Sequence, residues 1–317
     1  MNSICFITAG PVEWGSSRMR AYWPARYIPD SVVVTMAEAE EQGDIPDSTV
    51  VTMADAQQRG VPDAGVYVFQ KLVDPVLIAG LRAMGKIVVW DVCDPSWWFD
   101  KTGAIEAVNN VDAIVASSLP LAVDLGAWVA VNGTRAPKKT VIPDRVELSH
   151  FAPPTRYKPG EPVKLIWYGI AANRIALFAA VVNLMRWRGD GHDISLTIFD
   201  DAPDIHFPDL DAIMPVTYKR WTLDTEAETL AAHHIALLPP YPGPWGKVKS
   251  NNRAVTGWAA GLQVITGESY YDLPNAINAM EAGHDRREYV AANYNVEQSA
   301  RKWMDLINDL SGGKQHG

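Results

Sequence analysis

Cysteine is scarce in this sequence: there are only two, Cys5 and Cys93, and they lie far apart within apolar runs. Two such residues cannot form a disulfide framework, and they indicate buried thiols in a reducing compartment. No apolar run is long enough to span a membrane, and the sequence shows no signal-peptide pattern. We therefore expect a cytoplasmic protein without stable membrane insertion.

Several signatures of metal and nucleotide chemistry are also absent. No Cys/His cluster has zinc spacing, because His233 and His234 are adjacent and point to different faces. There is no Walker A loop and no Ser-His-Asp signature. The net charge of −9 argues against a strongly electrostatic nucleic-acid binder. A local basic group still offers contacts to phosphates, and it consists of Arg135, Lys138, Lys139 and Arg145.

Short apolar runs recur through the chain and alternate with helical patterns. The 317 residues, 48% hydrophobic and 21% charged, are enough for two soluble domains. The runs lie at 3–8, 65–71, 86–94, 111–118, 163–169, 194–199, 216–221 and 234–238. Because buried strands joined through helices are typical of parallel sheets, we expect an α/β protein with two Rossmann-like domains. A proline-rich run at 153–162 indicates a linker between them.

A segment near the start is duplicated. Residues 29–37 recur as residues 46–54, and 62–63 begin a truncated third copy. Two units are too few for a solenoid. The duplication predicts either an added strand and short helix or an extra edge hairpin in the first domain.

Two carboxylates and two tryptophans follow the most apolar strand of the first half. Asp91 and Asp94 lie at the end of the run 86–94, where ligand chemistry collects in parallel sheets. We predict one of them as a catalytic base, and Trp97 and Trp98 as an acceptor platform. The alternative is that Asp94 caps the next helix and the tryptophans pack in the core.

A cationic and polar stretch precedes a helical pattern in the second half. It follows the apolar run 234–238 and a loop rich in proline and glycine. A helix N-terminus exposes unpaired N–H groups and the positive end of a dipole, so this stretch predicts a diphosphate-binding site. The alternative is a capped helix with solvated lysines. The predicted ligands are Lys247, Lys249, Ser250, Asn251 and Asn252.

These features together resemble a GT-B fold nucleotide-sugar glycosyltransferase of the glycogen-synthase, or glycosyltransferase-4-like, group. The first helix carries Ser-x-Arg at 16–18, and a Gly-x-x-x-Asn loop lies at 169–173. Residues 142–153 are similar to the interdomain segment Ile-Pro-Asn-Gly…Phe-x-Pro, although Asp144-Arg145 replaces Asn-Gly. Residues 259–264 are similar to Ala-x-Gly-x-Pro-Val, with Gln263 in place of proline.

The resemblance implies an acceptor-side domain at 1–152, a nucleotide-sugar domain at 153–290, and a crossing helix with a tail at 291–317. The domains of this fold face each other across a cleft. The donor, a UDP-sugar, would be bound without a metal, since a helix dipole and basic side chains hold the departing diphosphate in this group. Arg145 would lie on the acceptor side. The donor residues that it implies, besides the five named above, are Gly15, Ser16, Arg18, Gly169, Asn173, Arg174 and Trp221.

The function that it implies is transfer of a sugar, a hexose, to an acceptor hydroxyl. The acceptor is open, and one alternative is a hydroxymethylated base in DNA, as for some phage enzymes of this fold. Two other classes stay open, a non-catalytic sugar-nucleotide-binding protein and an epimerase. The Glu-x7-Glu pair of many retaining members is replaced by Val248 and Thr256, so the stereochemical outcome is open too.

Overall fold

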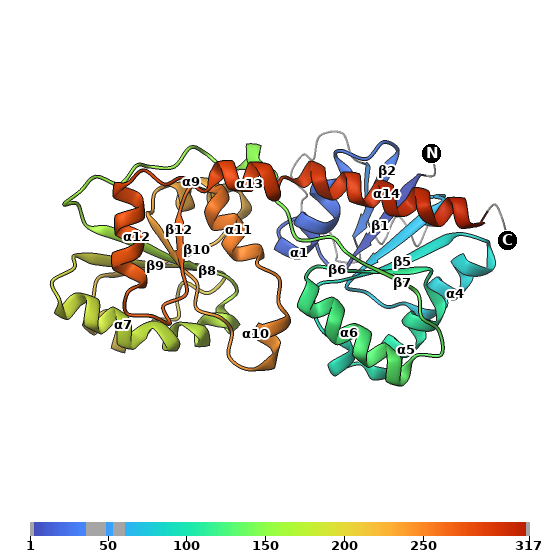
Figure 1. Ribbon diagram of the computed structural model, residues 1–317, viewed down its shortest axis with the longest axis horizontal. Helices are drawn as coiled ribbons and strands as arrows, with labels where there is room; N and C mark the ends of the chain where they lie inside the picture. Colours follow the sequence, from blue (N-terminus) through green and yellow to red (C-terminus); the bar gives the residue numbers. More distant parts are fainter. Residues whose placement is uncertain (1–2, 36–48, 53–60, 315–317) are drawn as a thin grey trace. The chain divides into compact units, whose positions relative to one another are not determined.

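The computed structural model describes residues 3–35, 49–52 and 61–314. The chain forms two compact units (Figure 1). Unit 1 comprises Met1–Arg145, Lys247–Ser250 and Asn295–Gly317, and unit 2 comprises Val146–Gly246 and Asn251–Tyr294. The short segment Lys247–Ser250 therefore clusters with the first unit, although the chain on both sides of it belongs to the second.

The first unit contains a seven-stranded parallel sheet, in the order β3-β2-β1-β4-β5-β6-β7. The strand order reverses between β1 and β4, and ligands of such sheets bind at the carboxyl ends of the strands at this switch point. The strands are β1 (Ile4–Thr8), β2 (Ser31–Thr35), β3 (Thr49–Thr52), β4 (Val66–Gln70), β5 (Ile87–Val92), β6 (Ala113–Ala116) and β7 (Lys138–Val141).

Helices cover both faces of this sheet. On one face, side chains such as Tyr67 and Trp90 share a core with α4, α5 and α6, and α5 lies beside α6 (Figure 1). On the other face, Phe6 of β1 meets Trp303 of α14 edge to face, with ring centroids 5.6 Å apart. The helices are α1 (Gly15–Ser17), η1 (Arg18–Tyr22), α2 (Trp23–Ala25), α4 (Pro75–Ala83), η2 (Ser96–Trp98), α5 (Lys101–Asn110), α6 (Leu119–Asn132) and α14 (Val296–Lys314).

The duplicated segment supplies two neighbouring strands. The first copy forms β2 and the second forms β3, and they pair in parallel. A hairpin would pair them antiparallel, so the hairpin interpretation is wrong and the added-strand interpretation holds for the strands. The predicted short helix falls on residues 36–48 and 53–60, outside the described residues.

The second unit contains a five-stranded parallel sheet, in the order β10-β9-β8-β11-β12. Its order reverses between β8 and β11, which places the switch point of this unit at their carboxyl ends. The strands are β8 (Val163–Tyr168), β9 (Ile194–Asp200), β10 (Val216–Arg220), β11 (Ile235–Leu237) and β12 (Gln263–Ile265).

Both faces of the second sheet are also covered. Trp167 and Leu237 share a core with α7, α8 and α12. On the other face α11 approaches so closely that a Cβ at Gly257 would lie 2.9 Å from Tyr168 Oη. The helices are η3 (Leu148–His150), η4 (Ala171–Leu177), α7 (Phe178–Gly189), α8 (Pro208–Ile213), α9 (Leu223–Ala231), α10 (Pro244–Val248), α11 (Asn252–Ala259), α12 (Asp272–Glu281) and α13 (Arg287–Asn293).

The predicted α/β class, with two parallel-sheet domains, is confirmed. The last helix, α14, belongs to the first unit, as a crossing helix at the end of the chain would. Within the segment 291–317, which we expect to hold a crossing helix and a tail, α14 continues through Lys314.

Candidate functional site

Polar residues gather at the switch point of the first unit. The loop 9–14 follows β1, Gln70 ends β4, and Lys71 follows β4. Lys71 has a φ of 65°, in the left-handed region that non-glycine residues rarely adopt, and its N–H donates to the Asp91 carbonyl at 2.9 Å. Backbone outliers of this kind cluster at functional sites. Sequence reasoning assigned no role to Lys71.

Asp91 lies in a buried ionic cluster. It is 0% exposed and accepts two hydrogen bonds from Arg20, at 2.7 and 2.5 Å. The Arg20 guanidinium also donates to Asp144 at 2.7 Å and to the Ile142 carbonyl at 2.9 Å. Burial disfavours the cation, but the two carboxylates outweigh it and raise the pKa of Arg20. With no accessible oxygen, Asp91 is placed to hold the fold together, and this geometry does not support the predicted base role.

Asp94 lies in a second, partly exposed cluster. Lys71 Nζ is 2.8 Å from one of its oxygens, and Lys249 Nζ contacts the other. Burial raises the pKa of Asp94, but Lys71 and Lys249 outweigh it and hold the pKa below its usual value. Asp94 is therefore an ionised carboxylate whose side chain retains some exposure between two lysines. Of the two predicted carboxylates, it is the one that a substrate is able to reach.

The segment 247–250 is fixed to the first unit by its neighbours in that unit. Val248 packs into the core of the first sheet, and its carbonyl accepts from Ser118 Oγ at 2.9 Å. Ser250 Oγ donates to Asp144 at 2.5 Å. The predicted diphosphate ligands Lys249 and Ser250 are thus paired with carboxylates, while Lys247 is exposed. Sequence reasoning placed all three directly ahead of one helix. In the structure Lys247 belongs to α10, and Lys249 and Ser250 directly precede Asn251, the N-cap of α11.

The predicted first-loop residues are close together. Gly15 and Ser16 are partly exposed at the start of the helical segment, which begins at Gly15 without a side-chain cap. Arg18 is buried, and its Nη1 donates to the Glu13 carbonyl at 3.0 Å. Its guanidinium also lies over the Trp23 ring. Arg18 therefore fixes the loop backbone, and a donor role for it stays a prediction.

The predicted acceptor-side residues differ in exposure. Trp97 is buried against Trp90, and its indole N–H donates to Asp124 at 2.9 Å. Arg145 is also buried and donates to the side chains of Gln298 and Ser299. Both side chains therefore support the packing of unit 1. For Trp97 this agrees with the alternative that the tryptophans pack in the core. Trp98 is 39% exposed and stays a candidate platform.

In unit 2 the predicted glycine loop follows β8 at the switch point. Gly169 and Asn173 are partly exposed there. Arg174 is buried, and its Nε and Nη2 donate to Asp200. Its Nη2 also donates to the Ala202 carbonyl, and its Nη1 donates to the Ile205 carbonyl. The Arg174 guanidinium is thereby committed to the loop after β9. The geometry does not support its predicted donor role.

Trp221 follows β10 and contacts an unpredicted carboxylate. Its indole N–H donates to Glu226 Oε1 at 3.1 Å, and His150 Nε2 lies 3.1 Å from Oε2 of the same residue. Glu226 is buried on α9, whose start is capped by Thr222. The partly exposed Trp221 ring is thus held in one orientation, as a surface that stacks on a nucleobase needs to be.

The start of α11 carries Asn251, Asn252 and a further cation, Arg253. Asn251 is exposed and donates to Tyr294 Oη at 3.0 Å, and Asn252 Oδ1 accepts from the Arg253 N–H at 2.6 Å. Tyr168 Oη donates to the Arg253 carbonyl at 2.6 Å, which ties the start of α11 to the end of β8. Sequence reasoning ended its predicted site one residue before Arg253.

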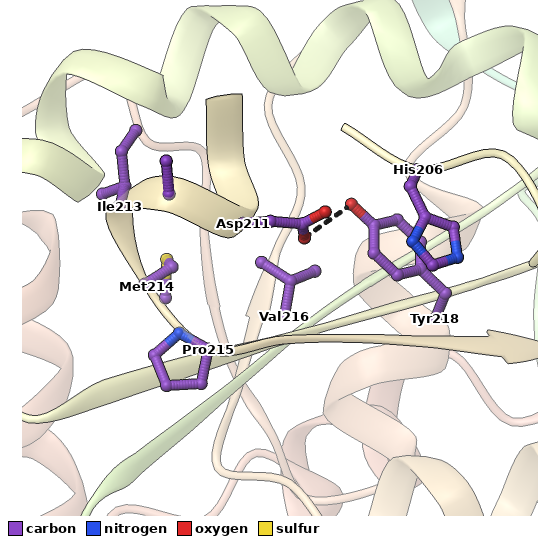
Figure 2. A pocket seen from close by; sticks show the side chains of 8 residues that line it. His206, Asp211, Ile213, Met214, Pro215, Val216 and Tyr218 are labelled. Carbon is purple, nitrogen blue, oxygen red and sulfur yellow. Dashed lines mark hydrogen bonds between the residues drawn. The ribbon is translucent and has the colours of Figure 1, made fainter. Parts of the chain in front are cut away.

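A separate surface hollow of about 510 Å³ lies at the edge of the second sheet (Figure 2). Tyr218 donates to Asp211 at 3.1 Å, and the His206 ring stacks on Tyr218. Met214 and Pro215 lead into the amino end of β10, whereas the candidate site is at carboxyl ends. The hollow is therefore not the donor site. Its lining is His206, Asp211, Ala212, Ile213, Met214, Pro215, Val216 and Tyr218.

Residues 3–35, 49–52 and 61–314 contain neither a membrane-spanning helix nor a group of metal ligands. Among these residues, no helix is both long and apolar enough to cross a membrane. Within the same ranges, no three His, Cys, Asp or Glu side chains group as ligands for a metal ion.

Comparison with solved structures identifies the fold. HepE from Anabaena, solved with UDP-glucose, aligns with a TM-score of 0.66 at 11% identity over 98% of this chain and 100% of its own. Sucrose-phosphate synthase from Thermosynechococcus elongatus aligns with 0.64 at 13% over 99% and 100%. Trehalose 6-phosphate synthase from Burkholderia multivorans aligns with 0.65 at 9% over 99% and 98%. These are GT-B structures, so the chain has the GT-B fold. No protein-family model and no curated protein matches the sequence.

Proposed function

We propose that this protein is a glycosyltransferase that moves a hexose from a nucleotide-sugar, with a UDP-sugar as the first donor to test, to an acceptor hydroxyl. The observation that carries the proposal is the GT-B fold over nearly the whole chain, shared with structures such as HepE, which was solved with UDP-glucose. Polar residues at the carboxyl ends of both sheets support it, because ligands of such sheets bind there.

The donor would bind mainly in the second unit. Trp221 would stack on the base, and the partly exposed Gly169 and Asn173 would face the sugar and the diphosphate. Asn251 and Asn252, at the start of α11, would meet the phosphates, where the helix dipole favours an anion. Lys249 and Ser250 stay predicted phosphate ligands, and phosphate binding would replace the carboxylate partner that each of them has now.

The reaction would break the bond between the anomeric carbon and the diphosphate oxygen, which keeps the electron pair. The acceptor oxygen would bond to the anomeric carbon, and its proton would pass to a carboxylate. We assign that base to Asp94, because Asp91 has no accessible oxygen. The lowered pKa of Asp94 keeps it ionised at neutral pH, and withdrawal of Lys249 toward a phosphate would raise its basicity.

Negative charge on the departing diphosphate would be balanced by cationic side chains and the α11 dipole, without a divalent metal. The alternative of a DNA acceptor keeps the exposed Arg135 and Lys139 in its support. In the basic group that suggested it, Arg145 is buried and Lys138 is paired with Asp309.

A donor screen tests the proposal. The protein is incubated with UDP-, ADP- and GDP-hexoses, singly and with a pool of saccharide, lipid and nucleic-acid acceptors, and products are read by mass spectrometry. Release of a nucleoside diphosphate with gain of a hexose on one acceptor is expected. Tight nucleotide binding without any turnover would instead support a non-catalytic binding protein, and conversion of a donor to its epimer without an acceptor would support an epimerase.

A further inference from the structure

Arg253 is a partly buried cation for which the described residues supply no counter-charge. Its Nη1 is shielded from solvent and has no hydrogen-bond partner in the described chain. Burial lowers the pKa of Arg253, opposed only by Tyr168. Desolvating a guanidinium without an anion costs free energy, so an arrangement of this kind indicates a ligand that brings the negative charge.

The fully buried arginines of the described chain have hydrogen-bond acceptors for their guanidinium groups. Arg20 pairs with Asp91 and Asp144, and Arg174 pairs with Asp200. Arg18 and Arg145 are buried as well, and each donates hydrogen bonds to uncharged acceptors. The fold therefore supplies acceptors to the guanidinium groups of these four arginines. Arg253 is treated differently, and this contrast is the observation that singles it out.

The location of Arg253 matches a ligand site. A Cβ built on Gly169 would lie 3.7 Å from Arg253 Nη1, so the guanidinium lies beside the first residue of the loop after β8. Gly169 follows the strand at which the order of the sheet reverses, and α11 follows the neighbouring strand β11. The guanidinium is thus at the switch point of unit 2, together with the uncapped start of α11.

We propose that Arg253 binds the diphosphate of the nucleotide-sugar. This inference rests on the proposed glycosyltransferase function and adds a ligand to its donor site. A guanidinium presents N–H groups in a planar fork that matches two phosphate oxygens, and the same charge stabilises the diphosphate as it leaves. Lys249 and Arg174 are both paired with carboxylates, whereas the Arg253 side chain has no anion to release first.

The backbone of Arg253 is held by groups that do not depend on its side chain. Tyr168 donates to its carbonyl, and Asn252 accepts from its N–H. Arg253→Gln removes the charge, keeps most of the length and leaves both bonds in place. The matched control is Arg186→Gln, which removes the same charge from an exposed position on α7 of the same unit.

Calorimetry with UDP, uridine and inorganic pyrophosphate tests the proposal. Arg253→Gln should weaken UDP and pyrophosphate binding about 10- to 100-fold, because a charge-assisted contact is lost. Uridine binding should be unchanged, and Arg253→Lys should restore part of the affinity. Thermal unfolding gives a second readout: without ligand the variant should melt at the same or a higher temperature, while the stabilisation by UDP shrinks. The control should behave like the wild type.

The outcomes separate this inference from the proposed function. Equal affinity of wild type and Arg253→Gln for UDP or pyrophosphate would overturn the role of Arg253 and leave the transferase proposal standing. Pyrophosphate binding that depends on Arg253, without binding of any nucleotide, would support the anion site and remove the nucleotide-sugar assignment. A wild type that binds none of these anions would overturn both. Equal loss of uridine and UDP binding would also overturn the diphosphate role.

Discussion

Asp91→Asn distinguishes a structural carboxylate from a catalytic one. In the folded protein Asp91 accepts from Arg20 Nε at 2.7 Å and from Nη2 at 2.5 Å, and neither side chain is more than 1% exposed. Asparagine keeps the shape but carries only one acceptor oxygen, and its amide turns a donor toward Arg20. Asp144 alone then faces the buried guanidinium.

The expected effect on stability is large. Removing one partner of a buried ion pair costs about 3–5 kcal/mol, because the other charge stays buried. For a unit of this size, about 2–4 °C of midpoint is lost per kcal/mol, so the variant should melt about 6–20 °C lower. Differential scanning calorimetry and urea unfolding measure both quantities. Turnover per folded molecule, measured well below the new midpoint, should stay within about threefold of the wild type.

The opposite result would refute this reasoning. If Asp91→Asn melts within about 1 °C of the wild type and loses turnover by the factor of about 10² to 10⁴ typical of a general base, then Asp91 is the base. Asp124→Asn is the matched control, because it removes a carboxylate of the same unit that has no ion pair among the described residues. Asp124 accepts from two indole N–H groups. It should lower the midpoint by less.

Three further predictions use other features. Asp94→Asn should lower turnover about 10²- to 10⁴-fold with little change in the affinity for UDP, and a variant with full turnover would remove Asp94 as the base. Turnover should survive chelation by EDTA, and its loss with rescue by manganese would assign the protein to a metal-dependent class. Burial lowers the pKa of His233 from 6.5 to about 4, so the folded state favours the neutral imidazole. The free energy of unfolding should therefore fall by at most about 3 kcal/mol as the pH drops from 6.5 toward 4. Urea unfolding at both pH values should show less of this loss in His233→Gln, and an unchanged loss would exclude His233 as its source.

Much of the fold was predictable because its signal is local. Apolar runs such as 86–94 and 163–169 contain β5 and β8. The duplicated segment was recognisable as strands, but its pairing direction depends on the crossover between the copies. The helix α12 was not predicted, because its residues follow a turn-rich stretch with no clear start signal.

The chemistry of the site was less predictable, because it depends on pairs far apart in the chain. Asp91 and Asp94 are three residues apart and end the same strand, yet only tertiary contacts with Arg20 bury the first. Lys249 and Ser250 have their carboxylate partners more than a hundred residues upstream. Arg253 is conspicuous for the opposite reason, since no described residue neutralises its guanidinium, and no pattern in a sequence reports that.

The central claim is transfer of a sugar from a nucleotide-sugar, and release of nucleoside diphosphate tests it most directly. Purified protein is incubated with each UDP-, ADP- and GDP-hexose, and free diphosphate is quantified over time with wild type, Asp94→Asn and Asp124→Asn. The account predicts that wild type and Asp124→Asn cleave one donor, with or without an added acceptor pool, and that Asp94→Asn cleaves it about 10² to 10⁴ times more slowly. Absence of cleavage of every donor by folded wild-type protein that binds UDP would contradict it.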